Sequence, residues 1–306
     1  MNILIYGYYG MSNLGDDLFE LMFEKMLTAR DHSITFVSPG KFKEIPQNTD
    51  FIICGGGDII DDYFMDDIII KKKNWEEKYH KYLPCYAVSF GLSYPENLKA
   101  GVVHDLDIFD HYIVRNKTDY NLLVQRYGNA NVDYLPDLGC LLPFYNLYTP
   151  NKTGNKIGIF LARTIFDSGR NKKYNDFVDQ MVTIVDKLSE TYNVDLVSMD
   201  RGRSKFNNDT ILSNEIFDKI KNKSKVQIID YQDQMKIYEL FPTYIFTICM
   251  RYHAHILSFV NNVPFVSLCM TNKVQYFMND NNLQNYVVRL NKSKNGIFIN
   301  NVNEIY

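Results

Sequence analysis

Short apolar runs alternate with amphipathic stretches along almost the whole chain. The apolar runs are rich in β-branched and aromatic residues, which favours strands, and the stretches between them repeat their apolar positions with the period of a helix. Such alternation is typical of parallel sheets covered by helices on both faces, so the sequence predicts an α/β fold. The predicted strands are 3–8, 34–38, 51–54, 85–90, 112–115, 132–135, 156–162, 194–199, 226–230, 244–249 and 265–268. The predicted helices are 16–29, 64–82, 96–106, 117–127, 174–192, 209–221, 232–239, 253–260 and 274–281.

One segment near the middle of the chain lacks this alternation of predicted strands and helices. Residues 143–155 are rich in Pro, Gly, Asn and Tyr and show no periodicity, and a complete α/β set lies on each side of them. We therefore predict an N-terminal domain of residues 1–146 and a C-terminal domain of residues 147–306. The expected architecture is two doubly wound, Rossmann-like domains that face each other across a cleft. From Asn291 onward the chain is rich in Asn, and no further element is predicted there.

Composition and charge narrow the class of protein. The chain has 306 residues, of which 46% are hydrophobic and 23% charged, as in ordinary soluble proteins. Its net charge of −3 argues against a nucleic-acid partner held by a general basic field. No apolar run approaches the ~20 residues that span a bilayer, and no secretory signal pattern opens the sequence. The five cysteines form no Cys-x-x-Cys pair and fit a reducing compartment, so a cytoplasmic location is expected.

Glycines gather after two of the predicted strands. The first loop, residues 7–15, does not have the spacing of the dinucleotide fingerprint, and Asp16 is most simply the N-cap of the helix that follows. The second group, Gly55, Gly56 and Gly57, comes before Asp58 and could form a nest of backbone N–H groups around an anion. A tight turn that lets a helix and the sheet pack closely is the alternative. Three glycines exceed what one turn requires, which favours binding.

Three arginines lie at or just beyond the ends of predicted strands. Arg115, Arg163 and Arg251 would all reach the carboxyl edge of a sheet, where open α/β folds bind ligands. A guanidinium suits a carboxylate or phosphate, whereas the alternative is that each arginine pairs with a carboxylate across the domain interface. His253 and His255 are two positions apart on a predicted helix and so point to different faces, which argues against one shared metal ion. We expect His255 to pack in the core or to support a neighbouring residue of the site.

Several of these segments together resemble the motifs of the polysaccharide pyruvyl transferase family. The resemblance is carried by Arg-x-His-Ala-x-Ile at 251–256, Val-Pro-Phe-Val at 263–266 and the pair Lys273-Val274. The opening segment 5–17 and the glycine segment 54–60 also resemble motifs of this family, in the family's order. Fainter similarities lie at 89–92, 113–115, 136–137 and 160–163. The set covers nearly the whole chain.

The resemblance implies a GT-B-like fold and a defined reaction. The family transfers the carboxyvinyl skeleton of phosphoenolpyruvate to a sugar, where it becomes a pyruvate ketal and phosphate is released. Phosphoenolpyruvate would be the donor substrate, with no further cofactor and no metal. The acceptor would be a saccharide, with free, lipid-linked and polymeric forms all open, and a homo-oligomer is compatible with the sequence. By resemblance, His253 is the catalytic acid or base. The substrate-binding candidates are Asn13, Gly55, Gly56, Gly57, Asp58, Arg115, Arg163, Arg251 and Lys273.

The sequence also departs from the family pattern. Asn116 follows Arg115 where an acid is usual, Asp119 replaces a common hydroxyl residue, and Tyr252 stands inside the Arg-x-His motif where leucine is expected. These changes leave room for a relative with another reaction. One alternative is a nucleotide-sugar glycosyltransferase of the GT-B type, although no Glu that could hold a ribose lies between Arg251 and Asn262. The other is a non-catalytic module that binds a glycan or a nucleotide.

Overall fold

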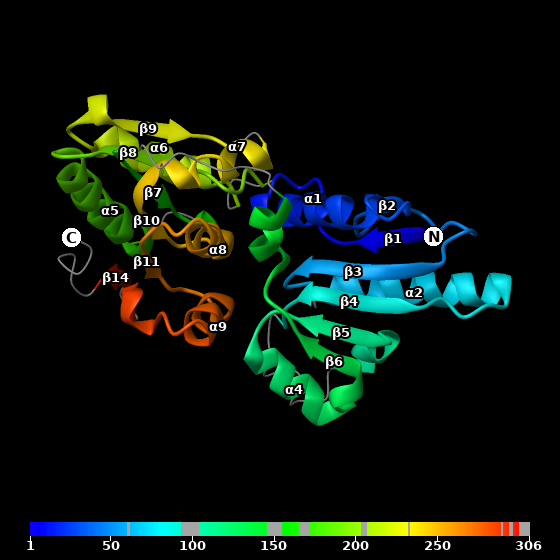
Figure 1. Cartoon of the computed structure of the whole chain (residues 1–306). Helices are drawn as coiled ribbons and strands as arrows, with labels where there is room; N and C mark the ends of the chain where they lie inside the picture. Colours follow the sequence, from blue (N-terminus) through cyan, green and yellow to red (C-terminus); the bar gives the residue numbers. More distant parts are fainter. Residues whose placement is uncertain are drawn as a thin grey trace. The chain divides into compact units, whose positions relative to one another are not determined.

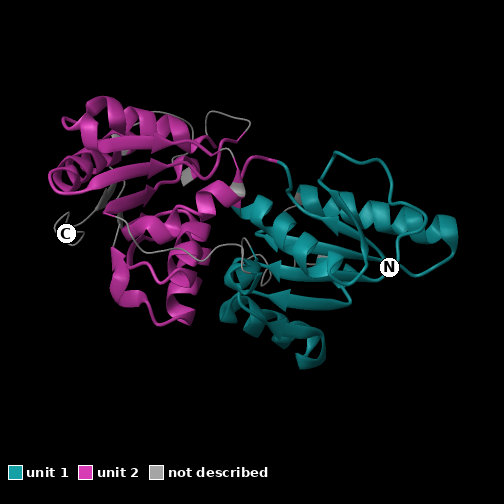
Figure 2. Ribbon diagram, turned by 45° about the horizontal axis from the view of Figure 1, so that its top comes forward, with its two compact units in different colours: residues 1–10, 15–145 teal, residues 11–14, 146–306 magenta. Residues whose placement is uncertain are grey.

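The computed structural model of the chain contains two compact units (Figure 2). It describes residues 1–59, 62–92, 104–145, 155–165, 172–202, 207–231, 233–288, 290–293 and 296–299. The first unit comprises residues 1–10 and 15–145, and the second comprises residues 11–14 and 146–306. The short segment 11–14 therefore belongs to the second unit, although the chain on both sides of it belongs to the first.

A six-stranded parallel sheet forms the centre of the first unit (Figure 1). Its order is β2-β1-β3-β4-β5-β6. Most of its strands are continuous apolar runs, because helices cover such sheets on both faces. Tyr6, Phe90 and Tyr112 from the strands and Phe64 from a covering helix are among the fully buried side chains of the unit. The strands are β1 (Asn2–Tyr6), β2 (Ser33–Val37), β3 (Phe51–Gly57), β4 (Cys85–Phe90), β5 (His111–Val114) and β6 (Val132–Tyr134). The helices are α1 (Leu14–Thr28), α2 (Asp62–Tyr79) and α4 (Lys117–Tyr127), with 3-10 turns η1 (His104–Ile108), η2 (Asn129–Asn131) and η3 (Leu138–Tyr145).

The second unit repeats this plan with a parallel sheet in the order β12-β11-β10-β7-β8-β9. Helices α5 and α6 bury Phe177, Met181 and Ile216 in one core with the apolar residues of β7 and β8. The strands are β7 (Lys156–Phe160), β8 (Asn193–Val197), β9 (Val226–Ile229), β10 (Tyr244–Cys249), β11 (Phe265–Leu268) and β12 (Val287–Val288). The helices are α5 (Lys172–Ser189), α6 (Asp209–Lys219), α7 (Gln234–Tyr238), α8 (Tyr252–Val260) and α9 (Asn272–Asp280), with 3-10 turns η4 (Arg163–Ile165), η5 (Lys223–Lys225), η6 (Phe241–Thr243) and η7 (Gln284–Tyr286).

The predicted α/β class with parallel sheets is confirmed. The bounds of α4, β10 and β11 are those expected from the sequence. The expectation that no element follows Asn291 is wrong, because β13 (Leu290–Ser293) and β14 (Gly296–Ile299) form an antiparallel pair, and β14 contacts α5. These strands are short and begin among polar residues, so their alternation is weak. Most of the helix predicted at 96–106 lies outside the described residues.

The glycine triplet extends β3 beyond its predicted end at residue 54. A Cβ atom at Gly55 would lie 2.5 Å from the ring of Phe23, and one at Gly56 would lie 2.2 Å from the ring of Phe19. Gly56 and Gly57 also have φ angles of +76° and +97°, which other residues rarely adopt. Close packing of α1 against the end of β3 therefore explains two of the three glycines without a ligand.

The start of α1 also differs from the prediction. The helix begins at Leu14, so Asp16 lies inside its first turn and is not the N-cap. An acidic residue in a first turn still stabilises a helix, because it faces the positive end of the helix dipole. Asp17 reaches back to the preceding loop, where its Oδ1 accepts a hydrogen bond of 3.2 Å from the backbone N of Gly10.

Candidate functional site

Arg115 links the ends of three strands in the first unit. It follows β5 and donates through Nη2 to Asp58, just after β3, at 2.6 Å. It also donates through Nη1 to Asp137, which follows β6, at 2.9 Å. The side chains of Arg115 and Asp137 are only 2% and 1% exposed. We call Arg115, Asp58 and Asp137 the Arg115 cluster. Its carboxylates are in the same unit as the arginine, and they engage both terminal nitrogens.

The end of β4 lies directly against this cluster. A Cβ atom at Gly91 would be 2.7 Å from Asp58 Oδ1 and 3.2 Å from Arg115 Nε, so only glycine fits there. Ser89 has a φ angle of +53°, a strained value for a residue with a side chain. Its Oγ accepts a hydrogen bond of 3.1 Å from the backbone N of Leu138. Four neighbouring strand ends thus form one tightly fitted edge.

Asp119 is a fully buried acid beside this edge. Asn116 caps α4 by accepting from the backbone N of Asp119 at 2.8 Å, and its Nδ2 donates to Asp119 Oδ2 at 2.6 Å. The amide of Asn116 thus engages both the backbone N–H and the carboxylate of Asp119. The backbone N of Leu92 donates to the same oxygen at 2.9 Å. Burial raises the pKa of the Asp119 carboxyl to about 6, against the lowering effect of these hydrogen bonds. Oδ1 of Asp119 has no hydrogen-bond partner among the described residues.

Arg251 is the corresponding arginine of the second unit. It is the N-cap residue of α8 and donates to Asp209 through two nitrogens, Nε at 2.9 Å and Nη2 at 2.6 Å. Nη2 also lies 3.2 Å from Asp200 Oδ2. We call Arg251, Asp200 and Asp209 the Arg251 cluster. Burial disfavours the charged guanidinium, but the two carboxylates outweigh this and raise the pKa of Arg251. Its side chain remains 16% exposed.

Asp209 holds several parts of the second unit together. It is the first residue of α6 and is 1% exposed. Besides Arg251, it accepts hydrogen bonds from the backbone N of Arg163 at 3.0 Å and of Met199 at 3.4 Å. Arg163 therefore reaches this cluster through its backbone, while its guanidinium lies 5.5 Å from the ring of Tyr174.

The two histidines of α8 have different surroundings. His255 is fully buried, with Nδ1 2.8 Å from the backbone O of Arg251 and Nε2 2.8 Å from Ser267 Oγ. Burial lowers the pKa of His255 to about 4, so this imidazole is neutral near pH 7 and packs α8 against β11. His253 lies in the first turn of α8 and is half-buried, with its ring 5.2 Å from that of Tyr252.

Two further predicted residues lie near the start of α8. Asn13 forms an antiparallel bridge with Asp200, and the backbone N of neighbouring Leu14 donates to Met199 O at 2.8 Å. Lys273 lies in α9, with Nζ 5.9 Å from the ring of Tyr252. The second unit thus gathers Asn13, Arg163, Arg251, His253 and Lys273 around one sheet edge. The first unit gathers Gly55, Gly56, Gly57, Asp58 and Arg115 around another.

Three acids were not among the residues expected to form a site. Asp137 is the third residue after β6, Asp200 is the third residue after β8, and Asp209 opens α6. An aspartate shortly after an apolar strand was therefore the sequence signal that could have identified Asp137 and Asp200 as site residues. The structure shows that these acids, together with Asp58, are the partners of the predicted arginines.

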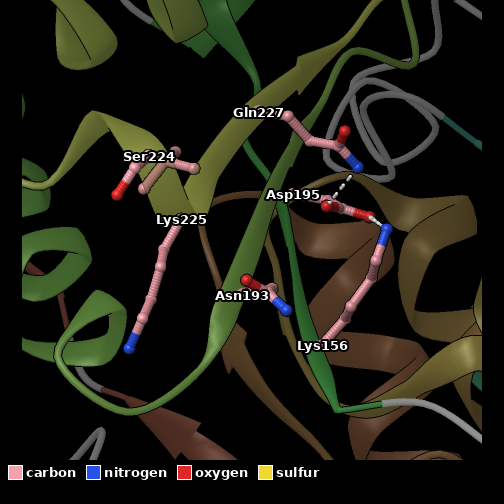
Figure 3. Close-up of a pocket in the computed structure, with 7 residues that line it drawn as sticks. Lys156, Asn193, Asp195, Ser224, Lys225 and Gln227 are labelled. Carbon is pink, nitrogen blue, oxygen red and sulfur yellow. Dashed lines mark hydrogen bonds and ion pairs between the residues drawn. The ribbon is translucent and has the colours of Figure 1, made fainter.

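A separate hollow of about 130 Å³ lies at the amino ends of β7, β8 and β9 (Figure 3). Inside it, Asp195 accepts hydrogen bonds from Gln227 at 2.7 Å and Lys156 at 3.4 Å, and Tyr244 adds another at 3.1 Å. These polar groups satisfy one another, and they lie at the strand ends opposite to the edge that carries Arg251. We therefore do not assign the substrate to this hollow. It is lined by Lys156, Asn193, Asp195, Ser224, Lys225, Val226 and Gln227.

Neither a metal cluster nor a membrane helix is found in the part of the chain that the structure describes. No group of three or more His, Cys, Asp or Glu side chains there could hold a metal ion. The helices described are too short or too polar to cross a bilayer.

Solved structures similar in fold to this chain include enzymes in complex with UDP or UDP-GlcNAc. S. aureus MnaA in complex with UDP is 11% identical, with a TM-score of 0.62 over 96% of this chain and 84% of its own. The Methanocaldococcus jannaschii UDP-GlcNAc 2-epimerase, in complex with UDP-GlcNAc and UDP, is 10% identical, with a TM-score of 0.57 over 99% of this chain and 96% of its own. An alpha-glucosyltransferase in complex with UDP and DNA is 13% identical, with a TM-score of 0.54 over 97% and 83%. At these identities the likeness shows the fold alone.

The family is defined by sequence. The family model of polysaccharide pyruvyl transferases matches residues 13–268, which include both arginine clusters and α8. The protein belongs to the polysaccharide pyruvyl transferase family. No curated protein sequence matches the chain.

Proposed function

We propose that this protein transfers the pyruvyl group of phosphoenolpyruvate to a saccharide as a ketal. The observation that carries the proposal is the start of α8. Arg251 is fixed there by Asp209 through Nε and Nη2, and His253 lies two residues further along the chain. A cation and an imidazole at the end of β10 match the two needs of the reaction, which are to hold an anion and to move a proton.

The reaction balances with two sugar hydroxyl groups and one phosphoenolpyruvate. Protonation of the methylene carbon makes a methyl group and leaves the neighbouring carbon electrophilic. One hydroxyl oxygen bonds to that carbon, the C–O bond to phosphate breaks, and the second hydroxyl closes the ketal ring. One hydroxyl proton balances the new methyl group and the other leaves on phosphate. No electrons are gained or lost overall, so the transfer requires no redox partner.

The residues of the chain would divide this work. His253 would supply or accept the proton, and Arg251 would bind the phosphate or carboxylate of the donor. Lys273 and Asn13 lie near enough to the start of α8 to contribute further polar contacts. Arg115 already donates to Asp58 and Asp137, so we assign it the task of holding Asp58 and the Gly55–Gly57 backbone in place. The backbone N–H groups of that segment would be the anion donors of the first unit.

A nucleotide-sugar transferase is the second candidate function. The observation that favours it is the fold, since the structural neighbours named above were solved with UDP or UDP-GlcNAc bound. The family match favours pyruvyl transfer, because it covers the segment that carries Arg251 and His253.

Calorimetric titration of phosphoenolpyruvate, run beside UDP-sugars, separates these candidates. We expect phosphoenolpyruvate to bind the wild type and Arg251→Ala to weaken it at least about 10-fold, since a charge-assisted hydrogen bond is worth about 1.5–3 kcal/mol. Arg201→Ala is the matched control, because Arg201 neighbours Asp200 but pairs with Asp230 and is half exposed. Binding of a UDP-sugar alone would overturn the proposal in favour of a glycosyltransferase.

Turnover tests the role of His253. Release of phosphate from phosphoenolpyruvate in the presence of saccharide diols should fall about 10²- to 10⁴-fold in His253→Gln, while donor binding is retained. His80→Gln is the control, because His80 is an exposed histidine at the end of α2. Equal turnover in the two variants would remove His253 from the mechanism. A chain that binds donor and saccharide but never releases phosphate would be a binding module.

A further inference from the structure

The hydrogen bonds of Arg251 leave one side of its guanidinium open. A guanidinium has five N–H groups, one on Nε and two on each terminal nitrogen. Asp209 accepts from Nε and from Nη2, and Asp200 lies within 3.2 Å of Nη2. These contacts use Nε and Nη2 only. Among the described residues, they leave the two N–H groups of Nη1 without an acceptor. Nη1 is therefore the atom that can meet a bound anion.

Asp209 is built to fix this orientation. Its two oxygens accept one hydrogen bond each from Nε and Nη2, and such bidentate pairs are among the strong interactions of an arginine with a carboxylate. The carboxylate is itself held by the backbone N of Arg163 and is 1% exposed, so it has little freedom to move. Rotation of the guanidinium would break both bonds, and Nη1 consequently keeps one direction.

Asp200 orients Arg251 less firmly than Asp209 does, and its negative charge opposes the binding of an anion. It meets the guanidinium through one contact of 3.2 Å, and its other oxygen accepts from the backbone N of Gly202 at 2.8 Å. With Asp200 and Asp209 both ionised, two carboxylates face one cation, and the cluster repels an approaching anion. Protonation of Asp200 alone would leave the cluster neutral and keep the pair that orients Arg251.

We propose that Asp209 positions Arg251 for an anionic substrate while Asp200 weakens that binding, so that the anion binds together with a proton on Asp200. This inference rests on the proposed function in one respect, namely that Arg251 contacts the anion. It adds two residues with distinct roles and a coupling between anion and proton. Phosphoenolpyruvate, or any compact dianion, is the class of ligand concerned.

The surroundings of Asp200 favour this coupling. Burial raises the pKa of Asp200, Asp209 adds to the increase, and Arg251 opposes it. A bound anion would raise the pKa of Asp200 further, because like charges disfavour ionisation. Among the other groups, Arg201 is engaged by Asp230 at 3.2 Å, and buried His255 is neutral. His253, on the first turn of α8, lies two residues from Arg251 and requires its own control.

Sulfate is a suitable probe because its charge does not change between about pH 5 and about pH 8, whereas that of a phosphate ester does. We expect wild-type affinity for sulfate to fall as pH rises through this range. Asp200→Asn should bind about 5- to 10-fold more tightly than the wild type at the upper end and lose most of the pH dependence. Asp209→Asn should bind at least about 10-fold more weakly at every pH, because Arg251 is no longer oriented. Asp230→Asn, which discharges the half-buried acid that follows β9 and pairs with Arg201, should match the wild type.

A measurement on the wild type alone covers the case in which a variant fails to fold. Titrating sulfate in two buffers of different ionisation enthalpy gives the number of protons taken up. Net uptake that persists in His253→Gln supports Asp200 as the acceptor. Binding that needs Arg251 but takes up no proton would overturn the coupling and leave the proposed function standing. If neither sulfate nor phosphoenolpyruvate binds the wild type, both inferences are wrong.

Discussion

The two arginine clusters have the same sequence pattern and different structures. Arg115 and Arg251 each follow an apolar strand of a parallel sheet, and each meets two aspartates of its own unit. The side chain of Arg115 is 2% exposed and uses both terminal nitrogens in ion pairs. Arg251 is 16% exposed and is held mainly by one carboxylate, through Nε and Nη2. The Arg115 cluster is closed, in that both terminal nitrogens of its arginine are paired and the side chain is buried. The Arg251 cluster leaves Nη1 of its arginine outside the ion pairs.

This difference separates a structural arginine from a binding arginine better than position does. Both lie at the carboxyl edge of a sheet, where ligands of α/β proteins bind. A cation that is 2% exposed and paired at both terminal nitrogens stabilises the strand ends that supply its partners, and its burial keeps a substrate from its other N–H groups. A cation fixed through its inner edge can meet a substrate without rearrangement.

The largest expected effect is on the stability of the first unit. Arg115→Ala would leave Asp58 and Asp137 without their cation, and removing one partner of a buried ion pair costs about 3–5 kcal/mol. Hydrogen exchange of amides in β4 and β5 would measure the loss. Arg126→Ala is the control, since Arg126 approaches Asp107 at 3.8 Å on the surface and its removal should cost at most about 1 kcal/mol. Similar losses in both variants would contradict a structural role for the Arg115 cluster.

The second unit should gain stability as pH rises, because of His255. The pKa of this histidine is about 4 in the folded protein, below the ~6.5 of an unfolded chain, so between these values the unfolded state binds more protons. The contribution of neutral His255 to the free energy of unfolding is complete above about pH 6.5. It falls by up to about 3 kcal/mol as the pH drops to about 4. Hydrogen exchange in β10 and β11 should show this change.

His255→Gln gives the corresponding control. The variant retains polar side-chain atoms near Arg251 O and Ser267 but cannot take up the proton. The stability difference between wild type and variant should therefore shrink as pH falls. A difference that is constant across the range would mean that His255 is not held neutral.

The sequence predicted the frame of this fold and the arginine of each cluster, but only Asp58 among the four aspartates that pair with them. Apolar runs located the strands because parallel strands are buried on both faces, and Arg115 and Arg251 were found because each directly follows such a run. Asp209 was missed because its role depends on the end of β8 and the start of α6 meeting α8, which no local pattern contains. The close packing of Phe19 and Phe23 on Gly55 and Gly56 is likewise a tertiary contact, and it gives the glycine triplet a structural cause that its spacing did not reveal.

The smallest expected effect concerns Asp119, and it should run opposite to that of His255. The pKa of the Asp119 carboxyl is about 6 in the folded first unit, above the ~3.9 of an unfolded chain, so between these values the folded state binds more protons. Its contribution to stability is fully present below about pH 3.9 and is lost as pH rises through about 6. Asp119→Asn removes the charge and keeps an oxygen for Leu92 and Asn116, but its new N–H groups lack an acceptor. We therefore expect the variant to be about 1–2 kcal/mol more stable than the wild type near pH 8 and no more stable near pH 4, as measured by hydrogen exchange in β5. If the wild type is the more stable at about pH 8, the ionised carboxylate is stabilised by the Arg115 cluster, and that cluster is less closed than its geometry indicates.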